Sequence, residues 1–206
     1  RAWAMSYSVK ELYYTLQGEG AQVGRAAVFL RFAGCNLWSG REEDRAAAIC
    51  NFCDTDFVGV DGAGGGRFAD ASELSEAVIA AWPAGARGNP YVVCTGGEPL
   101  LQLDDSLIAA LKACRFEIAI ETNGTIEAPD GIDWICVSPK STATLNQTSG
   151  NELKLVYTQN DAKPEQYEDL KFDHLFLQPM DRARRQQTKL AAIEYCKKNP
   201  QWRLSV

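Results

Sequence analysis

The sequence is poor in histidine, has no excess of basic residues and contains no long apolar run. Lys and Arg together number 21 against 27 for Asp and Glu, a formal net charge of −6, which disfavours binding to duplex nucleic acid or to an anionic membrane. No apolar run approaches the roughly 20 residues of a membrane span, and no signal peptide is recognisable at the start. We therefore expect a cytoplasmic protein with no nucleic-acid or membrane partner.

The cysteine pattern of a disulfide framework is also missing. Seven cysteines are scattered along the chain, which is typical of thiols and metal ligands in a reducing compartment. Four lie inside apolar segments, where we expect them to pack as small buried hydrophobic side chains: Cys94, Cys114, Cys136 and Cys196. We expect one domain, 1–206, because this length allows a chain to bury roughly 70% of its unfolded surface.

The other three cysteines, Cys35, Cys50 and Cys53, give the strongest chemical signal in the sequence. Fourteen residues separate the first two and two separate the last two, and the closing CNFC spacing lets two thiolates chelate one metal centre. A closed structural site needs four protein ligands, whereas a catalytic site keeps one position open. Three ligands therefore indicate chemistry at the metal. The alternative is a structural zinc site in a non-catalytic binding module, with His174 or Cys94 as fourth ligand.

Strands and helices are predicted to alternate along most of the chain. Apolar and alternating runs predict strands at 9–14, 27–32, 91–94, 116–120, 132–137, 152–156 and 174–177, and an extended run at 202–206. Helices are predicted from a capping box at Asp70 and Glu73 to Trp82, and at 103–115, 165–170 and 184–198. Five glycines between Gly59 and Gly66 predict an irregular, flexible connector or lid. This alternation predicts an α/β fold, an open partial β/α barrel of about six mainly parallel strands with few helices.

Polar motifs directly follow several of the predicted strands. They are Cys35, the run Thr95 to Glu98, the run Glu121 to Gly124, the run Ser138 to Lys140 and the run Gln178 to Asp181. Barrel enzymes build their sites from the loops at the carboxyl ends of the strands. We therefore expect these motifs to meet at one rim of the barrel.

Several short motifs, taken in their order along the chain, resemble a known family. A strand ending at Gly34, the three cysteines and Thr95-Gly96-Gly97-Glu98-Pro99 resemble the radical S-adenosylmethionine (SAM) superfamily. The cysteine loop here carries an insert at 36–49, and this form is similar to the 7-carboxy-7-deazaguanine synthase family, QueE, of queuosine and 7-deazapurine biosynthesis. Leu16-Gln17-Gly18-Glu19-Gly20 and Cys53-Asp54-Thr55 carry the same resemblance, which covers most of the chain.

The resemblance implies a set of cofactors and binding residues. A [4Fe-4S] cluster would be held by Cys35, Cys50 and Cys53, with SAM on its fourth iron, and Thr55 would be a ligand of Mg²⁺. SAM would contact Phe52, Gly97, Glu98, Ser138, Pro139, Lys140, Gln178, Pro179, Met180 and Asp181. The substrate would contact Leu16, Gln17, Gly18, Arg31 and Thr95.

The residues by themselves also permit simpler roles at several of these positions. Gly97 and Glu98 suit an ordinary tight turn before Pro99, and the run Ser138 to Lys140 suits a solvated turn. Phe52 can serve packing alone, Thr55 can close a turn, and Arg31 can be only an ion-pair partner.

The implied reaction is a radical ring contraction of 6-carboxy-5,6,7,8-tetrahydropterin to 7-carboxy-7-deazaguanine with loss of ammonia, catalysed by a carbon–nitrogen lyase. The resemblance also implies an electron donor such as flavodoxin, a homodimer, and a tail beyond Val206 that closes over the substrate. The nearest alternative is a radical SAM activating enzyme that acts on a protein partner. The family's substrate residues Gln17, Arg31 and Thr55 disfavour that alternative.

Overall fold

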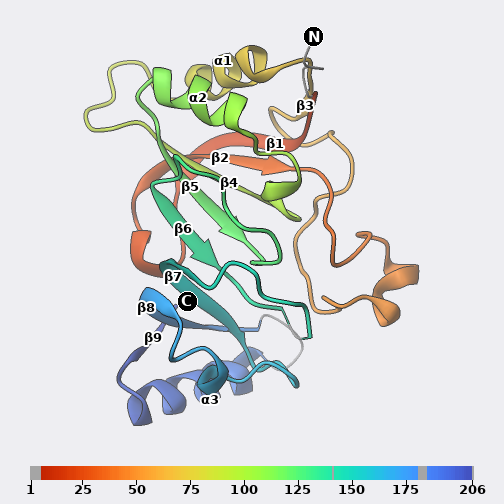
Figure 1. Ribbon diagram of the computed structural model, residues 1–206, viewed down its shortest axis with the longest axis vertical. Coiled ribbons are helices and arrows are strands. Elements are labelled where there is room, and N and C mark those ends of the chain that lie inside the picture. Colours follow the sequence, from red (N-terminus) through yellow and green to blue (C-terminus); the bar gives the residue numbers. More distant parts are fainter. Residues whose placement is uncertain (1–5, 141, 181–184, 206) are drawn as a thin grey trace.

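The frame of the computed structural model is a single curved sheet that is open at both ends (Figure 1). The structure describes residues 6–140, 142–180 and 185–205. Nine strands lie in the order β3-β1-β2-β4-β5-β6-β7-β8-β9. They are β1 (Tyr7–Leu16), β2 (Ala26–Phe32), β3 (Gly66–Phe68), β4 (Tyr91–Gly96), β5 (Glu117–Thr122), β6 (Trp134–Val137), β7 (Ser149–Tyr157), β8 (Lys171–Pro179) and β9 (Trp202–Leu204). This arrangement confirms the predicted open partial barrel.

Most neighbouring strands are parallel, as the alternating pattern predicted. Each pair from β2 and β4 through to β8 and β9 is parallel, whereas β1 runs antiparallel to both β2 and β3. The carboxyl ends of the parallel strands therefore meet at one edge of the sheet. The described residues of the polar motifs predicted at a common rim lie at or just beyond the ends of β2, β4, β5, β6 and β8 at this edge.

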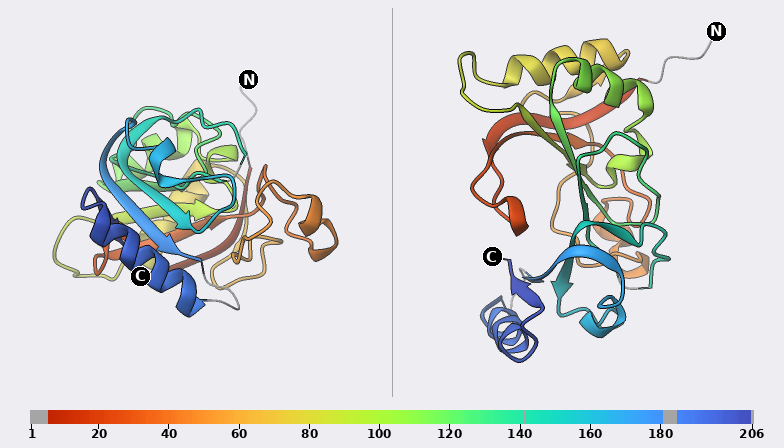
Figure 2. Two further views of the ribbon diagram at one scale, coloured as in Figure 1. Left: turned by 90° about the horizontal axis from the view of Figure 1, so that it is seen from below. Right: turned by 60° about the vertical axis from the view of Figure 1, so that its left-hand side comes forward.

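Three helices cover the sheet at its two ends (Figure 2). The first two are α1 (Ala71–Ala81) and α2 (Asp105–Ala113), and each begins after an aspartate, Asp70 or Asp104, whose carboxylate accepts a backbone N–H of the first turn at 3.0 Å. The third, α3 (Arg185–Lys198), packs against β8 and β9. In the described ranges, no helix is long and apolar enough to cross a membrane.

The prediction of a helix at 165–170 is wrong. The structure has only a 3-10 turn there, η4 (Pro164–Gln166). A helix needs several turns before its hydrogen bonds offset the cost of nucleation, and this segment is too short. Tyr167, buried in the core beside β8, follows the turn directly and leads the chain into that strand.

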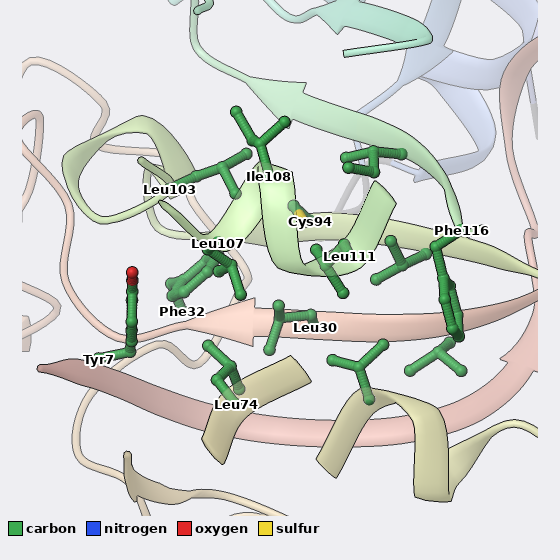
Figure 3. Close-up of a cluster of buried hydrophobic side chains, with 14 of the residues drawn as sticks. Tyr7, Leu30, Phe32, Leu74, Cys94, Leu103, Leu107, Ile108, Leu111 and Phe116 are labelled. Carbon is green, nitrogen blue, oxygen red and sulfur yellow. The ribbon is translucent and has the colours of Figure 1, made fainter. Parts of the chain in front are cut away.

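The main core lies between the sheet and helices α1 and α2 (Figure 3). On β2, Val28, Leu30 and Phe32 face this core, while Ala27 and Phe29 face the other side of the sheet with Tyr91 and Val93 of β4. Side chains on both faces of the central strands are therefore buried, which explains their continuous apolar runs. Phe29 and Arg31, on the inner face of β2, also line a cavity.

The four cysteines predicted to be buried have different environments. Cys94 and Cys136 are buried, and the Cys94 sulfur lies within the main core beneath α2 (Figure 3). Cys196 is half-buried. The prediction is wrong for Cys114, which is exposed because it is the C-cap of α2 and follows the last buried turn of that helix.

The glycine-rich segment, predicted to be an irregular, flexible connector or lid, is irregular over residues 59–65 but is held against β1 by hydrogen bonds. Gly62 N–H donates to the carbonyl of Lys10 at 2.9 Å, and Leu12 N–H donates to the carbonyl of Ala63 at 2.8 Å. The connector then enters β3, whose Gly66 pairs with Val9. A Cβ at Gly65 would lie 2.2 Å from the Lys10 carbonyl oxygen, so glycine is needed here for close approach.

We predict that Gly65→Ala destabilises the protein by roughly 1–3 kcal/mol, because the new methyl group overlaps backbone atoms that are fixed in the sheet. Gly66→Ala is the matched control, since a Cβ there meets only the Phe68 ring at an ordinary 3.8 Å. Urea denaturation of the two variants without cofactor measures the difference. Equal stability would show that the connector can lift from β1 without cost.

Candidate functional site

A cavity of about 620 Å³ lies at the carboxyl edge of the parallel strands. The β1–β2 turn, the cysteine loop and the ends of several strands contribute to its wall. Most of the site residues predicted from sequence line it: Leu16, Gln17, Gly18, Arg31, Cys50, Phe52, Cys53, Thr55, Thr95, Gly97, Ser138, Lys140, Gln178, Pro179 and Met180. Residues separated by up to about 160 positions in sequence are therefore brought into one wall by the parallel sheet.

Three of the described site residues are not in this wall, and a fourth predicted residue cannot be placed in or out of it. Asp181 lies outside the described residues. Cys35 is half-buried in the cysteine loop, and Pro139 is buried, with its carbonyl accepting a hydrogen bond from Gln159 at 3.1 Å. The side chain of Glu98 is fully buried beside the cavity. Because the side chain is buried, the contact with SAM that was predicted for Glu98 would be made by its backbone.

Glu98 holds the ends of β4 and β5 together. Its carboxylate accepts hydrogen bonds from the Thr122 hydroxyl and the Asn123 N–H, each at 2.8 Å, and from the Leu100 N–H at 3.1 Å. Burial raises the pKa of Glu98 even though these donors oppose the rise. This side chain therefore has a structural role at the rim, where it links the ends of β4 and β5.

The loop after β4 packs directly on the loop that carries Cys35. A Cβ on Gly97 would lie 2.2 Å from the Gly34 carbonyl oxygen and 2.6 Å from the Cys35 Cβ. The backbone N–H of Glu98 donates to the same Gly34 carbonyl at 3.0 Å. Only glycine allows this approach, so Gly97 has a packing reason beyond the simple tight turn considered from sequence.

The cysteine loop brings two of its three thiols, those of Cys50 and Cys53, into contact. The sulfur of Cys35 accepts a hydrogen bond from the Leu37 N–H at 3.4 Å. A hydrogen bond between the Cys50 and Cys53 thiols, assisted by the backbone and hydroxyl of Thr55, lowers the pKa of Cys53 to about 6. Within the described ranges, no three His, Cys, Asp or Glu side chains converge as ligands of a single ion. A cubane cluster places each cysteine on a different iron, so its ligands stand apart.

A network of charges around the buried side chain of Lys154, which the sequence did not predict, forms another part of the wall. The ammonium of Lys154 lies 2.6 Å from a Glu19 carboxylate oxygen and 3.5 Å from one of Glu121. The Glu121 carboxylate also accepts hydrogen bonds from the amide of Gln17 at 3.0 Å and the hydroxyl of Thr95 at 3.1 Å. This carboxylate therefore orients two of the predicted substrate residues.

The charges in this network set the ionisation of Glu121. Burial by itself raises the pKa of that carboxyl, but the ammonium of Lys154 and the hydrogen bonds from Gln17 and Thr95 outweigh burial and hold the pKa below its ordinary value. Glu121 is therefore an anion at neutral pH. Sequence signals for it were its place at the start of the polar run Glu121 to Gly124, at the end of β5, and the charge of Lys154 between two leucines of β7.

Arg31 also lies in the wall with a fixed orientation. Its Nε donates to a Glu11 carboxylate oxygen at 2.7 Å on the neighbouring strand. The ion pair considered from sequence is thus present, and it fixes the plane of the guanidinium beside the cavity.

The tip of the β1–β2 turn reaches across the open side of the sheet. Gly20 N–H donates to the Ser205 hydroxyl at 3.0 Å, and Ala21 N–H donates to the Glu152 carboxylate on β7 at 2.9 Å. These bonds join the first hairpin to the far end of the chain, as the close approach of the two in Figure 2 shows. They leave one face of the cavity bounded by the turn that carries Gln17 and Glu19.

The chain was compared with known proteins, and no protein-family model matches it. It is 62% identical to the 7-carboxy-7-deazaguanine synthase of Caulobacter vibrioides, over 98% of this chain and 96% of that one. The synthase of the same name from Nitratidesulfovibrio vulgaris is 56% identical, over 97% and 95%. The solved structure of QueE from Escherichia coli aligns with a TM-score of 0.66 and 27% identity, over 98% of this chain and 93% of that chain.

The chain belongs to the 7-carboxy-7-deazaguanine synthase family. It is therefore an enzyme of the radical SAM type, which confirms the class predicted from the motifs. The alternative of a zinc-binding module is wrong, and both of its candidate fourth ligands lie outside the cavity wall. Cys94 is completely buried in the core, and the ring of His174 stacks on Trp134 at 6.0 Å. Membership of the synthase family also excludes the protein-activating alternative.

We predict that Lys154→Met destabilises the protein and reverses its response to mild acid. In the parent protein, the Glu121 pKa lies below its ordinary value, so the stability that Glu121 contributes is present at neutral pH and is lost as pH falls through that pKa. Without Lys154, burial raises the Glu121 pKa instead, and protonation relieves an unpaired buried charge.

The free energy of unfolding of Lys154→Met should therefore rise, relative to the parent, when the pH is lowered from about 8 to about 5. Urea denaturation of the cofactor-free proteins at the two pH values measures this change. The double variant Lys154→Met/Glu121→Gln removes the titrating group and should show no such rise. A parallel pH dependence of parent and single variant would contradict the assignment of this network.

Proposed function

We propose that this cavity binds SAM and 6-carboxy-5,6,7,8-tetrahydropterin together and that the chain converts the pterin to 7-carboxy-7-deazaguanine with loss of ammonia. The observation that carries the proposal is the cavity wall, where the cysteine loop faces polar residues from several parallel strands. Its support is the identity of 62% to a synthase of that name. The proposed catalytic unit is one domain, 1–206, with the insert at 36–49.

We assign the [4Fe-4S] cluster to Cys35, Cys50 and Cys53. Three thiols on one loop suit an iron–sulfur cluster with one open iron. Cys136 also lines the cavity, but its thiol faces the Glu152 carboxylate at 3.5 Å and burial raises its pKa well above the ordinary value, so it stays protonated. When bound and reduced, the cluster and SAM together supply a 5′-deoxyadenosyl radical that removes hydrogen from the substrate.

The residues beside the cysteine loop have the properties of a SAM site. Lys140 places a half-buried cation near the thiols of Cys50 and Cys53, and its ammonium donates to the Ser138 hydroxyl. A cation in a dry wall suits the carboxylate of the methionyl group. The proposed SAM contacts are Phe52, Gly97, Glu98, Ser138, Pro139, Lys140, Gln178, Pro179, Met180 and Asp181.

The opposite part of the wall has the properties of a pterin site. The guanidinium of Arg31, oriented by Glu11, matches the planar carboxylate of the substrate. Glu121 holds Gln17 and Thr95 in place, so their hydrogen-bonding groups are ordered before the substrate arrives. The proposed substrate contacts are Leu16, Gln17, Gly18, Arg31 and Thr95. In this arrangement the chain orients the pterin and excludes water, and the cofactors supply the radical chemistry.

We also propose Mg²⁺ at Thr55, which lines the cavity between the cysteine loop and the pterin site. Magnesium commonly takes one or two protein oxygens and fills its octahedron with substrate and water oxygens, so one hydroxyl is sufficient. An electron donor such as flavodoxin and assembly as a homodimer complete the proposal.

The cluster assignment predicts a sharp contrast between cysteines. Cys50→Ala should lose the cluster, because two thiolates cannot replace three, whereas the exposed Cys114→Ala should keep it. Iron and sulfide analysis after anaerobic reconstitution measures both. Full iron and sulfide in Cys50→Ala would remove Cys50 from the ligand set.

The substrate assignment predicts that the enzyme discriminates strongly against pterins that lack the 6-carboxylate. A site built for a polar group rejects an analogue without it by a factor of up to roughly 10⁴. We expect turnover of 6-carboxytetrahydropterin, almost none of a tetrahydropterin lacking the carboxylate, and a large loss in Arg31→Lys, since an ammonium cannot form two parallel hydrogen bonds. Anaerobic turnover with dithionite, followed by product mass, measures these rates. Equal rates for the two pterins would contradict the assignment.

A further inference from the structure

The insert at 36–49 folds back onto the cysteine segment that follows it. It contains the 3-10 helix η2 (Glu42–Ala47), drawn as the orange coil at the right of Figure 1. The centre of the insert is Trp38, which is 7% exposed although its neighbour Ser39 is exposed. An aromatic side chain this buried in a surface insert indicates that the insert has its own packed interior.

Trp38 is covered on one side by a cation and on another by a ring. The Arg45 guanidinium carbon lies 4.0 Å from the centroid of the indole, a cation–π contact. Phe57 meets the indole at 5.6 Å in an edge-on arrangement, and Phe57 is almost completely buried. Since Phe57 follows Cys53 by four residues, this stack joins the insert to the segment beyond the cysteines.

The same guanidinium binds the backbone between the cysteines. An Arg45 Nη donates to the carbonyl of Cys53 at 2.9 Å and to the carbonyl of Asn51 at 3.2 Å. Its Nε donates to Glu42 at 2.7 Å, which fixes the plane of the group. The backbone N–H of Cys50 donates to the carbonyl of Leu37 at 3.4 Å. The insert therefore binds the CNFC segment through hydrogen bonds to backbone groups of both Cys50 and Cys53.

These bonds matter because residues 50–55 belong to no helix or strand. Residues 50–55 form turns and irregular backbone between η2 and Phe57. A segment that is already ordered loses less conformational entropy when a ligand binds. A fixed cation close to a cluster also favours its reduced, more negative state and so raises its reduction potential.

We propose that Arg45 is a positioning residue for the cluster, which holds the Cys50–Cys53 segment in its ligating arrangement and contributes a fixed positive charge beside it. The inference rests on the proposed cluster at Cys35, Cys50 and Cys53. The hydrogen bonds to the carbonyls and the positive charge can be tested separately, because they have different chemical requirements. Both carbonyl bonds come from one Nη, which is held in place because Nε and the other Nη pair with the Glu42 carboxylate, and an ammonium cannot reproduce this arrangement. The charge requires only a cation.

The test compares Arg45→Met with Arg45→Lys, and uses Arg41→Met as a matched control. Arg41 lies in the same insert, its side chain is 71% exposed, and its charged group has only a 3.8 Å pairing with Glu43. Removing it changes the net charge equally without touching the carbonyls of Asn51 and Cys53. Each protein is first examined without cofactor by hydrogen exchange of the peptide containing residues 50–55, and then after reconstitution.

Arg45→Met should exchange about tenfold faster over 50–55 and lose its cluster about tenfold faster in air, because hydrogen bonds to a charged group are lost. Its cluster should have a lower reduction potential, measured by electron paramagnetic resonance during redox titration. Arg45→Lys should restore the potential but not the slow exchange. Arg41→Met should match the parent protein in all three measurements.

The proposal would be overturned if Arg45→Met and Arg41→Met showed the same rate of hydrogen exchange over 50–55 and the same rate of cluster loss. If Arg45→Met fails to fold, the contrast between Arg45→Lys and the parent in hydrogen exchange still tests it, and identical exchange would overturn it. If the parent protein itself binds no iron, the proposed function fails. The exchange experiment on the cofactor-free protein still shows whether Arg45 orders residues 50–55.

Discussion

The backbone contact between the Cys35 loop and the loop after β4 is the constraint on which the rest of the site depends. Gly97 lies against Gly34 with no room for a side chain, and Glu98 N–H binds the Gly34 carbonyl. Glu98 then binds the end of β5 through Thr122 and Asn123. A series of backbone and carboxylate contacts thus fixes the distance between the thiols and the neighbouring strands. Displacing any of these loops would separate the proposed cluster from the proposed SAM site.

The second requirement of the site is closure of an open barrel. A complete β/α barrel surrounds its site with strands, whereas this sheet stops at β9. The β1–β2 turn supplies the missing side, since Gly20 and Ala21 bind Ser205 and Glu152 at the other end of the sheet. The same turn carries Gln17 and Glu19 into the charge network of Lys154. Closure of the fold and the order of the substrate wall therefore rest on one hairpin.

The cysteine loop follows a different principle from the strands. Its Cys50–Cys53 segment is held by side chains of the insert, above all by the guanidinium of Arg45 over Trp38, instead of by a sheet ladder. Such a loop can keep its shape while it remains at the surface, where the proposed cluster would meet its proposed electron donor. The insert thus replaces, with its own packed interior, the support that neighbouring strands give to the other rim loops.

The sequence by itself determined the class of fold, the edge at which the site lies and most of its proposed residues. Alternating strand and helix patterns imply parallel strands, and parallel strands bring the ends that carry Cys35, Thr95 and Ser138 to one edge for reasons of connection alone. Short motifs such as CNFC carry their chemistry in local spacing. These features depend on neighbours in the chain, so the sequence displays them directly.

Only the tertiary structure decided the roles that depend on distant partners. Glu121 becomes an anion that orders Gln17 and Thr95 because Lys154, 33 residues away, lies beside it. The glycine-rich segment was predicted to be a flexible connector or lid and is packed on β1, since its close approach to Lys10 appears only when the strands are paired. Arg45 looks like a surface charge until Trp38 and the Cys53 carbonyl are placed around it. Local pattern encodes which elements form, but the energy of a buried charge or a close backbone contact depends on groups that only folding brings together.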